Sequence, residues 1–255
     1  MNRLVIKRLS ALLITVVIVL GAWYGYHLHA NSNALWTIVS RQCVPHQQAR
    51  HVPSPCQRVE LSQGYALLKD KVGIVQYLLI PTAKVSGVES LELQQPQTPN
   101  YFYLAWTQLP QLSRTLAKPI PSTLLSLAIN AKWGRSQNQL HIHMSCLRGD
   151  IAHQLAVQQS TITEHWQRYT LLNHRYWIRA LTLDQLRSLS LFQRVATELP
   201  DVKPGSGREG IAVTTLADGR LVALVLRTDW TKGVLGSAEE LQDHRCEALG
   251  DPYRN

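Results

Sequence analysis

An uncharged apolar stretch near the N-terminus, residues 9–26, constrains most strongly what this chain of 255 residues can fold into. As a helix it spans about 27 Å, close to the hydrocarbon core of a bilayer at about 30 Å. Arg3, Lys7 and Arg8 precede it with no compensating acid. The pattern predicts a cytoplasmic tail and a transmembrane anchor within residues 1–30, with the following residues exported. A cleaved signal peptide is the alternative.

The positions of the four cysteines are consistent with export of the chain that follows the anchor, because all four lie beyond this stretch. Cysteines in an oxidising compartment are typically paired, and no Cys-x-x-Cys spacing favours zinc or thioredoxin-like chemistry. Four cysteines allow three pairings. We favour Cys43–Cys56, which closes a short proline-rich loop, and Cys146–Cys246, which ties the end of the chain to its middle.

The composition excludes a disordered chain, since 45% of the residues are hydrophobic. Without the three basic residues ahead of the anchor, 23 Lys and Arg face 17 Asp and Glu, a balance of +6. This excess suits an anionic membrane surface or a phosphate-bearing substrate. Nucleic acid is disfavoured, because the basic residues form no stripe along the chain.

The exported part divides into a connecting segment, residues 31–60, and two halves, residues 61–150 and 151–255. Strands are expected at residues 65–68, 75–80, 124–129, 139–146, 176–181, 210–216 and 221–226, and helices near residues 33–41, 101–116 with a break at Pro110, about 150–169 and 184–198. The order strand–helix–strand–strand occurs twice. We predict an α+β fold with a mainly antiparallel sheet and packed helices, compatible with a degenerate duplication; chance recurrence is the alternative.

Residues 139–146 are the segment most informative about chemistry. On a strand, alternate side chains share a face, so Gln139, His141, His143 and Ser145 would face one side and apolar residues the other. Two histidines among four polar positions favour a functional site over a solvated face.

Three chemistries compete for this face. A neutral imidazole can attack phosphorus and form a covalent intermediate, provided that its second nitrogen is held by an acceptor. A metal site would need a third protein ligand, and the other histidines are scattered. Two-histidine phosphoesterase chemistry needs two His-x-Ser/Thr pairs, of which the chain has only residues 143–145. Nucleophilic catalysis is therefore the favoured interpretation, with no metal and no cofactor.

The segment of residues 124–145 resembles the active-site hairpin of the histidine-triad superfamily, in which histidines alternate with apolar residues. The resemblance implies that His141 is the nucleophile and that His143 assists at the phosphate. Asp70 would contact ribose hydroxyls, although a plain turn residue is the alternative. Further substrate-binding residues implied in this way are Asn130, Gln137, Asn138, Gln139 and Ser145. Gln139 departs from the superfamily's first histidine, but its main chain can still orient the nucleophile.

An ordered set of motifs resembles one family more closely, the bacterial CDP-diacylglycerol pyrophosphatases. It includes the Cys43 to Cys56 loop, residues 77–82, 126–130, 137–146 and the ending 238–246. The resemblance implies hydrolysis of CDP-diacylglycerol to CMP and phosphatidate through a cytidylyl-histidine. It also implies a single-pass protein of the bacterial inner membrane, with a periplasmic catalytic domain at the phospholipid surface and no further protein partner.

Two other functions remain open from sequence. One is an envelope protein that binds a nucleotide or phospholipid without catalysis; the other is a broader nucleoside-diphosphate hydrolase or cytidylyl transferase. His244 is interpreted as structural, beside a disulfide. The aromatic cluster at residues 101–106 is interpreted as core. Residues 82–100 and the helix after them are expected to form a lipid-side wall of the site.

Overall fold

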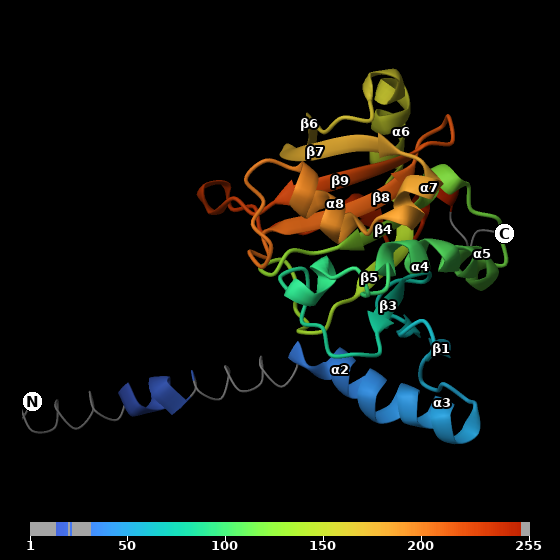
Figure 1. The fold of residues 1–255 in the computed structure, drawn as a ribbon, viewed down its shortest axis with the longest axis vertical. Coiled ribbons are helices and arrows are strands. Elements are labelled where there is room, and N and C mark those ends of the chain that lie inside the picture. The colour runs from blue at the N-terminus through green and yellow to red at the C-terminus, as the bar shows by residue number, and fades with distance from the viewer. Residues whose placement is uncertain (1–13, 20, 22–31, 251–255) are drawn as a thin grey trace, which may run out of the picture.

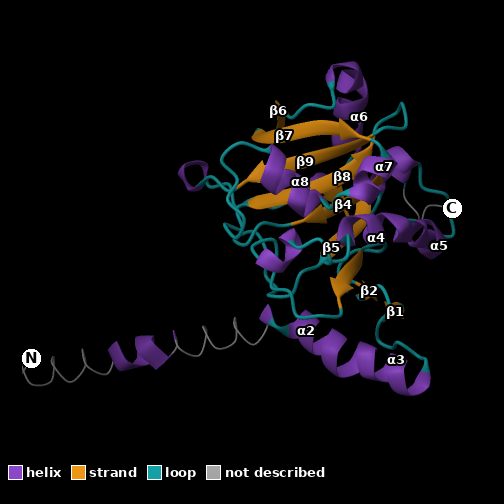
Figure 2. Cartoon of the chain, viewed as in Figure 1, coloured by secondary structure: helices purple, strands orange, loops and turns teal. Residues whose placement is uncertain are grey.

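Ten antiparallel strands form one sheet in the computed structural model, which describes residues 14–19, 21 and 32–250. The strand order is β1-β2-β3-β5-β4-β8-β9-β7-β6, and β10 pairs with the end of β5 (Figure 2). The strands are β1 (Arg58–Glu60), β2 (Tyr65–Lys69), β3 (Tyr77–Pro81), β4 (Leu125–Ile129), β5 (Ile142–Leu147), β6 (Gln167–Leu171), β7 (His174–Leu181), β8 (Glu209–Thr215), β9 (Leu221–Arg227) and β10 (Gln242–Asp243). The mixed α+β fold with a large antiparallel sheet is confirmed.

Four helices pack on one face of the sheet, in front of it in Figure 1. They are α4 (Tyr101–Gln108), α5 (Pro110–Leu116), α7 (Leu183–Ser188) and α8 (Leu191–Glu198). Phe102 of α4 and Phe192 of α8 lie in the core of this face with their ring centroids 5.2 Å apart. The aromatic cluster at residues 101–106 therefore contributes to core packing, as expected, and Pro110 begins α5 as the second part of a divided helix.

Helices cover the opposite face in two separate places, and the C-terminal segment around Glu239 and Gln242 lies on it beside β4 and β5. Helix α6 (Gly149–Gln158) packs its Ile151 and Leu155 against the half of the sheet that contains β7 and β9. Helix α2 (Ala34–Ile38) continues through a π-helical turn (Val39–Cys43) into α3 (Val44–Arg50), and its Leu35 packs on β2 and β3. The part of the face next to β5 lies between these two covers.

The strand order agrees with the expected repeat. Strands β2, β3, β4 and β5 take the order β2-β3-β5-β4, and β6, β7, β8 and β9 take the mirror order β8-β9-β7-β6. The two sets meet at the antiparallel pair β4 and β8, where Leu127 lies opposite Val213. Each half therefore contributes a hairpin, a helical connection and a second hairpin to one continuous sheet.

Several predicted boundaries were wrong for identifiable reasons. The strand expected at residues 139–146 begins at Ile142, because the amides of Asn138 and Leu140 bond to loop carbonyls instead of a strand. The helix expected to reach residue 169 ends at Gln158, and β6 follows as an edge strand in which only Leu171 is buried. The helix expected over residues 184–198 is two helices, because Leu189 and Ser190 are extended.

Two disulfides are present, Cys43–Cys56 and Cys146–Cys246, the pairings favoured from the sequence. The first ties the N-terminal helix to the chain just before β1. The second joins β5 to the C-terminal segment, which β10 also holds against β5.

The expected transmembrane helix lies mostly outside the described residues. Residues 14–19 are helical, and Ile14, Val17 and Ile18 are exposed. Among the described residues, no helix is long and apolar enough to cross a membrane.

Loss of the two disulfides should differ in its effect on stability. Cys146–Cys246 spans 100 residues and Cys43–Cys56 spans 13, so the longer loop restricts the unfolded chain more. Replacing Cys146 and Cys246 by Ser should lower the free energy of unfolding by about 2–4 kcal/mol, measured by urea unfolding in detergent. The matched pair Cys43→Ser and Cys56→Ser should cost less. An equal or reversed ranking would contradict this account.

Candidate active site

The two histidines of the polar segment lie side by side on the part of the sheet face between α6 and α2. His143 is on β5 between Leu78 of β3 and Ala128 of β4, and His141 precedes the strand. Their ring centroids are 4.8 Å apart, and each residue is only 6% exposed. Ile142 and Met144 point to the opposite face, into the core. The predicted alternation is therefore confirmed across the strand itself.

A main-chain carbonyl fixes the orientation of His141. Its Nδ1 lies 2.6 Å from the carbonyl oxygen of Gln139. A carbonyl oxygen can only accept, so Nδ1 carries the proton and donates, which leaves the lone pair on Nε2. The Gln139 side chain lies elsewhere, donating to the carbonyls of Pro81 and Ala83.

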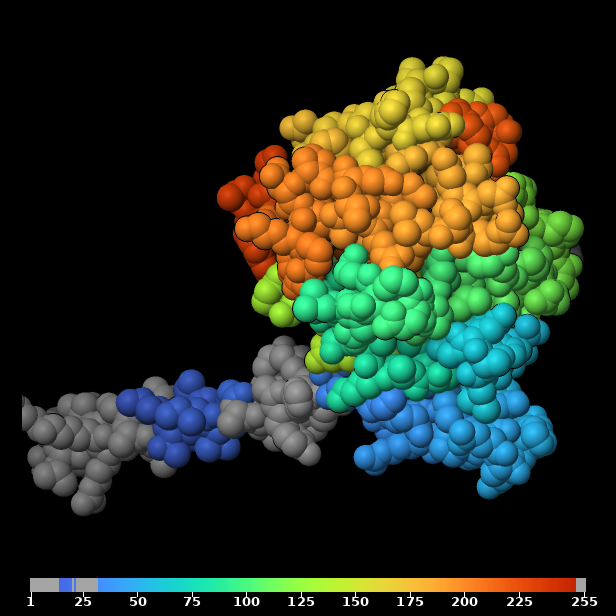
Figure 3. Space-filling view, viewed as in Figure 1, coloured from blue at the N-terminus to red at the C-terminus, as the bar shows by residue number. Residues whose placement is uncertain are grey.

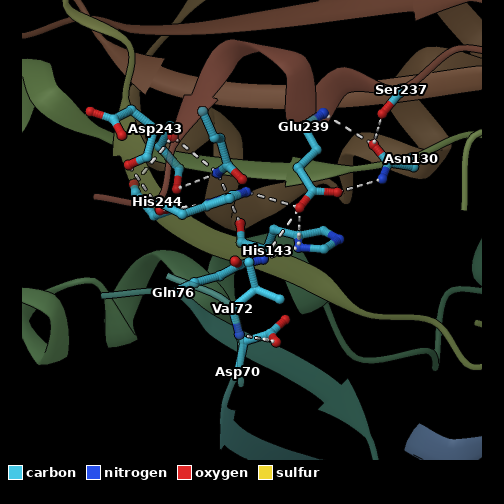
Figure 4. A network of polar contacts seen from close by, with 12 residues as sticks. Asp70, Val72, Gln76, Asn130, His143, Ser237, Glu239, Asp243 and His244 are labelled. Carbon is cyan, nitrogen blue, oxygen red and sulfur yellow. Dashed lines mark hydrogen bonds and ion pairs between the residues drawn. The ribbon is translucent and has the colours of Figure 1, made fainter. Parts of the chain in front are cut away.

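A partly buried carboxylate lies beside the second histidine. Nδ1 of His143 is 3.2 Å from Oε1 of Glu239 and 2.8 Å from the side-chain amide of Gln76 (Figure 4). Among the described residues, Nε2 of His143 has no hydrogen-bond partner. Glu239 comes from a short 3₁₀ helix (Ala238–Leu241), almost one hundred residues after the histidines.

Asn130, at the end of β4, holds this carboxylate in place. Its side-chain amide donates to Oε2 of Glu239 at 2.8 Å, and its Oδ1 accepts from the Glu239 backbone amide and from the Ser237 hydroxyl. Burial alone would raise the pKa of Glu239, but the hydrogen bond from His244 and the nearby histidines and Asn130 outweigh it and hold that pKa at about 2. Glu239 is therefore a carboxylate at neutral pH.

His244 connects the carboxylate to the far end of β5. Its Nε2 lies 3.1 Å from Oε1 of Glu239 and its Nδ1 lies 3.0 Å from the Ser145 hydroxyl. It does lie next to the Cys146–Cys246 disulfide, as the structural interpretation required, but it also belongs to the hydrogen-bond network of the histidine face.

Gly73 lets the turn between β2 and β3 approach this segment. Its φ of +73° lies in the left-handed region, and a Cβ there would be 2.4 Å from Cβ of His244. The amide of Ile74 donates to the His244 carbonyl at 3.0 Å. A glycine is therefore needed both for the turn and for the close contact.

Both histidines are neutral at neutral pH. Burial lowers the pKa of His141 below its usual range. Burial, together with the neighbouring His141, lowers the pKa of His143 to about 3, although Glu239 acts in the opposite direction. An unprotonated imidazole is the form that can act as a nucleophile or as a general base.

The histidines open into a cavity of about 750 Å³. Helix α2 forms one wall through Ala34, Leu35 and Ile38, and the turn after β2 contributes Asp70 and neighbouring residues. The polar lining residues on the side of the histidines are Gln76, Ser136, Gln137, His141, His143 and Glu239. Residues 82–116 are not among the lining residues, so the lipid-side wall expected there is wrong; those residues pack on the other sheet face.

The remaining residues implied by the resemblance fall into two groups. Asp70 and Gln137 line the cavity with the two histidines. The other four do not line it: Asn130 and Ser145 hold Glu239 and His244, Gln139 orients His141, and Asn138 bonds to Ser32 just before α2. The Asp70 carboxylate accepts from the Val72 amide within its own turn.

Glu239, His244 and Gln76 were not among the predicted site residues. One signal pointed to His244: with Cys146 joined to Cys246, a residue two positions earlier must lie near Ser145. Glu239 gave no such local signal. In the described part of the chain, no group of three or more His, Cys, Asp or Glu side chains is arranged to hold a metal ion.

A neutral histidine pair beside a partly buried carboxylate, in the lining of a cavity, has the arrangement of an enzyme active site. The sequence profile of the CDP-diacylglycerol pyrophosphatase family matches residues 30–250. The CDP-diacylglycerol pyrophosphatase of Yersinia pestis is 40% identical over 252 residues, which are 98% of each chain. This chain belongs to the CDP-diacylglycerol pyrophosphatase family, and its enzyme class is that of hydrolases of a pyrophosphate bond.

The buried histidines should make the protein sensitive to mild acid. The pKa of His143 is about 6.5 in the unfolded chain, and burial lowers this pKa to about 3 in the folded protein. Its contribution to stability is therefore complete above about pH 6.5 and is lost as the pH falls towards 3. Between pH 7 and pH 5 the loss should reach up to about 2 kcal/mol from this group.

Urea unfolding of the full chain in detergent at each pH measures this loss. His143→Asn should reduce the dependence of the unfolding free energy on pH, whereas His165→Asn, at an exposed position, should leave it unchanged. The same dependence in His143→Asn as in the wild type would show that His143 is not the group responsible.

Proposed function

We propose that the chain hydrolyses CDP-diacylglycerol to CMP and phosphatidate through a covalent nucleotidyl-histidine at His141. The observation that carries the proposal is the contact of 2.6 Å between Nδ1 of His141 and the Gln139 carbonyl. It commits Nε2 to nucleophilic attack and offers an acceptor for the positive charge that the ring acquires. The resemblance to the histidine-triad superfamily implies the same assignment.

In the first step, Nε2 of His141 attacks the phosphorus that carries the cytidine. A nitrogen–phosphorus bond forms and the bond from that phosphorus to the bridging oxygen breaks, so phosphatidate leaves with the electron pair. The cytidylyl-imidazolium retains its proton on Nδ1, which donates a hydrogen bond to the Gln139 carbonyl. Nε2 of His143 has no hydrogen-bond partner among the described residues. In the tautomer whose Nδ1 accepts from the Gln76 amide, Nε2 carries the proton and can donate to a phosphoryl oxygen; in the tautomer whose Nδ1 donates to Glu239, Nε2 can accept a proton.

In the second step, water attacks the same phosphorus and the imidazole of His141 leaves as a neutral ring. The water loses a proton as CMP forms, and His143 beside the Glu239 carboxylate is the nearest group able to accept it. Glu239 stabilises the resulting imidazolium. His143 thus accepts the proton and Glu239 stabilises the charge, while Gln76, Asn130 and His244 keep Glu239 in position.

The cavity is proposed to hold the cytidine side of the substrate. Its volume of about 750 Å³ lies in the range of small-molecule sites. Asp70 and Gln137 supply polar groups for the ribose and phosphates, as the resemblance implies, and the apolar side chains of α2 offer a surface for the base.

The fold is proposed to be histidine-triad-like, built from two degenerate halves. Support comes from the resemblance of residues 124–145 and from the mirror order of the two strand sets. The second half has no histidine face: the corresponding side of β9 carries Val222 and Leu224, packed under α6. The first half would therefore supply the histidine pair, and the second half would contribute Glu239 and His244 from its C-terminal segment.

The location is proposed to be the bacterial inner membrane, with residues 9–26 as a single span, the N-terminus in the cytoplasm and the catalytic domain in the periplasm, at the phospholipid surface. The basic residues before the span and two disulfides after it support this orientation. Protease should digest the domain in spheroplasts and spare it in inverted membrane vesicles; the opposite pattern would refute the orientation.

The direct kinetic test is CMP release from CDP-diacylglycerol in detergent micelles with EDTA present. His141→Ala should lower the rate by a factor of at least about 1,000, because the nucleophile itself is removed. His165→Ala, at an exposed site, should match the wild type. Equal release by His141→Ala and the wild type would mean that another group attacks. No release by the wild type would favour a binding protein, and comparable rates on water-soluble nucleotide-sugars would favour a broader hydrolase.

A further inference from the structure

Two exposed tryptophans meet at one margin of the molecule, away from the core. Trp133 is 50% exposed and Trp230 is 58% exposed, and their ring centroids lie 5.3 Å apart. Leu235 is 44% exposed, and its main chain lies beside Gly134, the residue after Trp133: a Cβ on Gly134 would be 3.2 Å from the Leu235 carbonyl oxygen. We call Trp133, Trp230 and Leu235 the aromatic patch. Large apolar side chains that cluster in the open usually mark an interaction surface.

Basic groups surround the aromatic patch. Nζ of Lys132 lies 5.2 Å from the centroid of the Trp133 ring, and Lys232 follows Trp230 in the same short turn. A cavity of about 440 Å³ borders that turn, and its charged or titratable lining residues are Arg168, His174, Arg175, Arg208, Arg227, Asp229 and Lys232. Asp229 pairs with Lys232, and Glu209 and Glu240 pair with Arg227 and His174. The Lys and Arg side chains around the patch still outnumber these acids, which gives this margin a positive potential.

The aromatic patch is built on the two loops that lead to the active site. The loops run side by side, because the Ala131 amide donates to the Gly236 carbonyl at 2.9 Å. One loop continues from Trp133 to Ser136 and Gln137 in the cavity wall. The other continues from Leu235 to Glu239, and Asn130 bonds to Glu239 across the two loops. A surface that held the patch would therefore lie beside the active site.

We infer that the aromatic patch docks on the surface of an anionic phospholipid bilayer. Tryptophan prefers the level of the lipid headgroups, and lysine and arginine around it attract anionic lipids. In Figure 3 the segment 229–235, in red, lies on the same side of the molecule as the described residues 14–19, in dark blue. The inference deepens the proposed function, since it rests on a lipid substrate that stays in the bilayer.

Docking would bring the catalytic cavity to its substrate in a fixed orientation. An anchor alone keeps the domain near the membrane but leaves it free to rotate, whereas a second contact restricts that rotation. The loop pair then presents Gln137 and Glu239 close to the headgroup region, where the pyrophosphate of a lipid-linked nucleotide lies. The patch thus acts on access to substrate and not on the chemical step.

The test uses the full chain in vesicles of phosphatidylcholine mixed with phosphatidylglycerol, with dibrominated lipids as quenchers of tryptophan fluorescence. Trp133→Phe with Trp230→Phe should remove a large part of the quenched signal, because the two removed rings lie at the lipid surface. Quenching should weaken at high salt or in vesicles of phosphatidylcholine alone. Equal quenched signals in wild type and variant would overturn the inference.

Rate measurements on two substrates distinguish an effect on membrane docking from an effect on the chemical step. Trp133→Ser with Trp230→Ser should lower kcat/KM on vesicle-bound CDP-diacylglycerol by about tenfold or more and leave hydrolysis of a monomeric short-chain analogue unchanged. Val157→Ser, at a 68% exposed position on α6, is the matched control and should change neither rate.

Each other outcome also has a defined meaning. Equal losses on vesicle-bound and monomeric substrates would overturn docking, because the patch would then act on the site itself. A concentration-dependent dimer that the serine variant abolishes, without lipid quenching, would assign the patch to a second copy of the chain. No hydrolysis of either substrate by the wild type, with lipid quenching intact, would refute the proposed function and leave docking supported.

Discussion

The candidate active site depends on one partly buried carboxylate, Glu239, and on the groups that keep it charged. A carboxylate away from water is costly unless hydrogen bonds satisfy it. Asn130 bonds to one oxygen, and His143, His244 and Gln76 surround the other. These residues come from β4, β5, the end of the chain and the start of β3, so the carboxylate fixes how four separate segments meet. The Cys146–Cys246 disulfide and the β10 pairing hold the same C-terminal segment on β5.

The sheet explains why there is one site although two halves share an architecture. Both halves contribute the same strand pattern, but the face of the second half is apolar at Val222 and Leu224 and is closed by α6. The face of the first half carries His143 and remains open between α6 and α2. Helix α2 covers β2 and β3 and forms the outer wall of the cavity. The helix that follows the proposed membrane anchor is therefore part of the active site.

Local patterns predicted the features that local physics determines. The alternation across β5, the break at Pro110 and the hairpin of β8 and β9 follow from periodicity and turn residues. The cysteine count allowed three pairings, and the favoured one is present. Glu239 could not be predicted in this way, because its role depends on a chain segment that returns to β5 after almost one hundred residues. Strand β6 was missed because an edge strand with exposed side chains has no apolar pattern, and the proposed lipid-side wall was placed on the wrong sheet face.

The central claim is that His141 carries the cytidylyl group during turnover. Its most direct test is to stop the wild-type enzyme at steady state with CDP-diacylglycerol under denaturing, non-acidic conditions and to locate any adduct by mass spectrometry of peptides. The account predicts an acid-labile cytidylyl group on the peptide that contains His141, absent from His141→Ala. A cytidylyl group on His143, a phosphatidyl group attached to the protein instead of a cytidylyl group, or efficient turnover by a variant without His141 would contradict this claim.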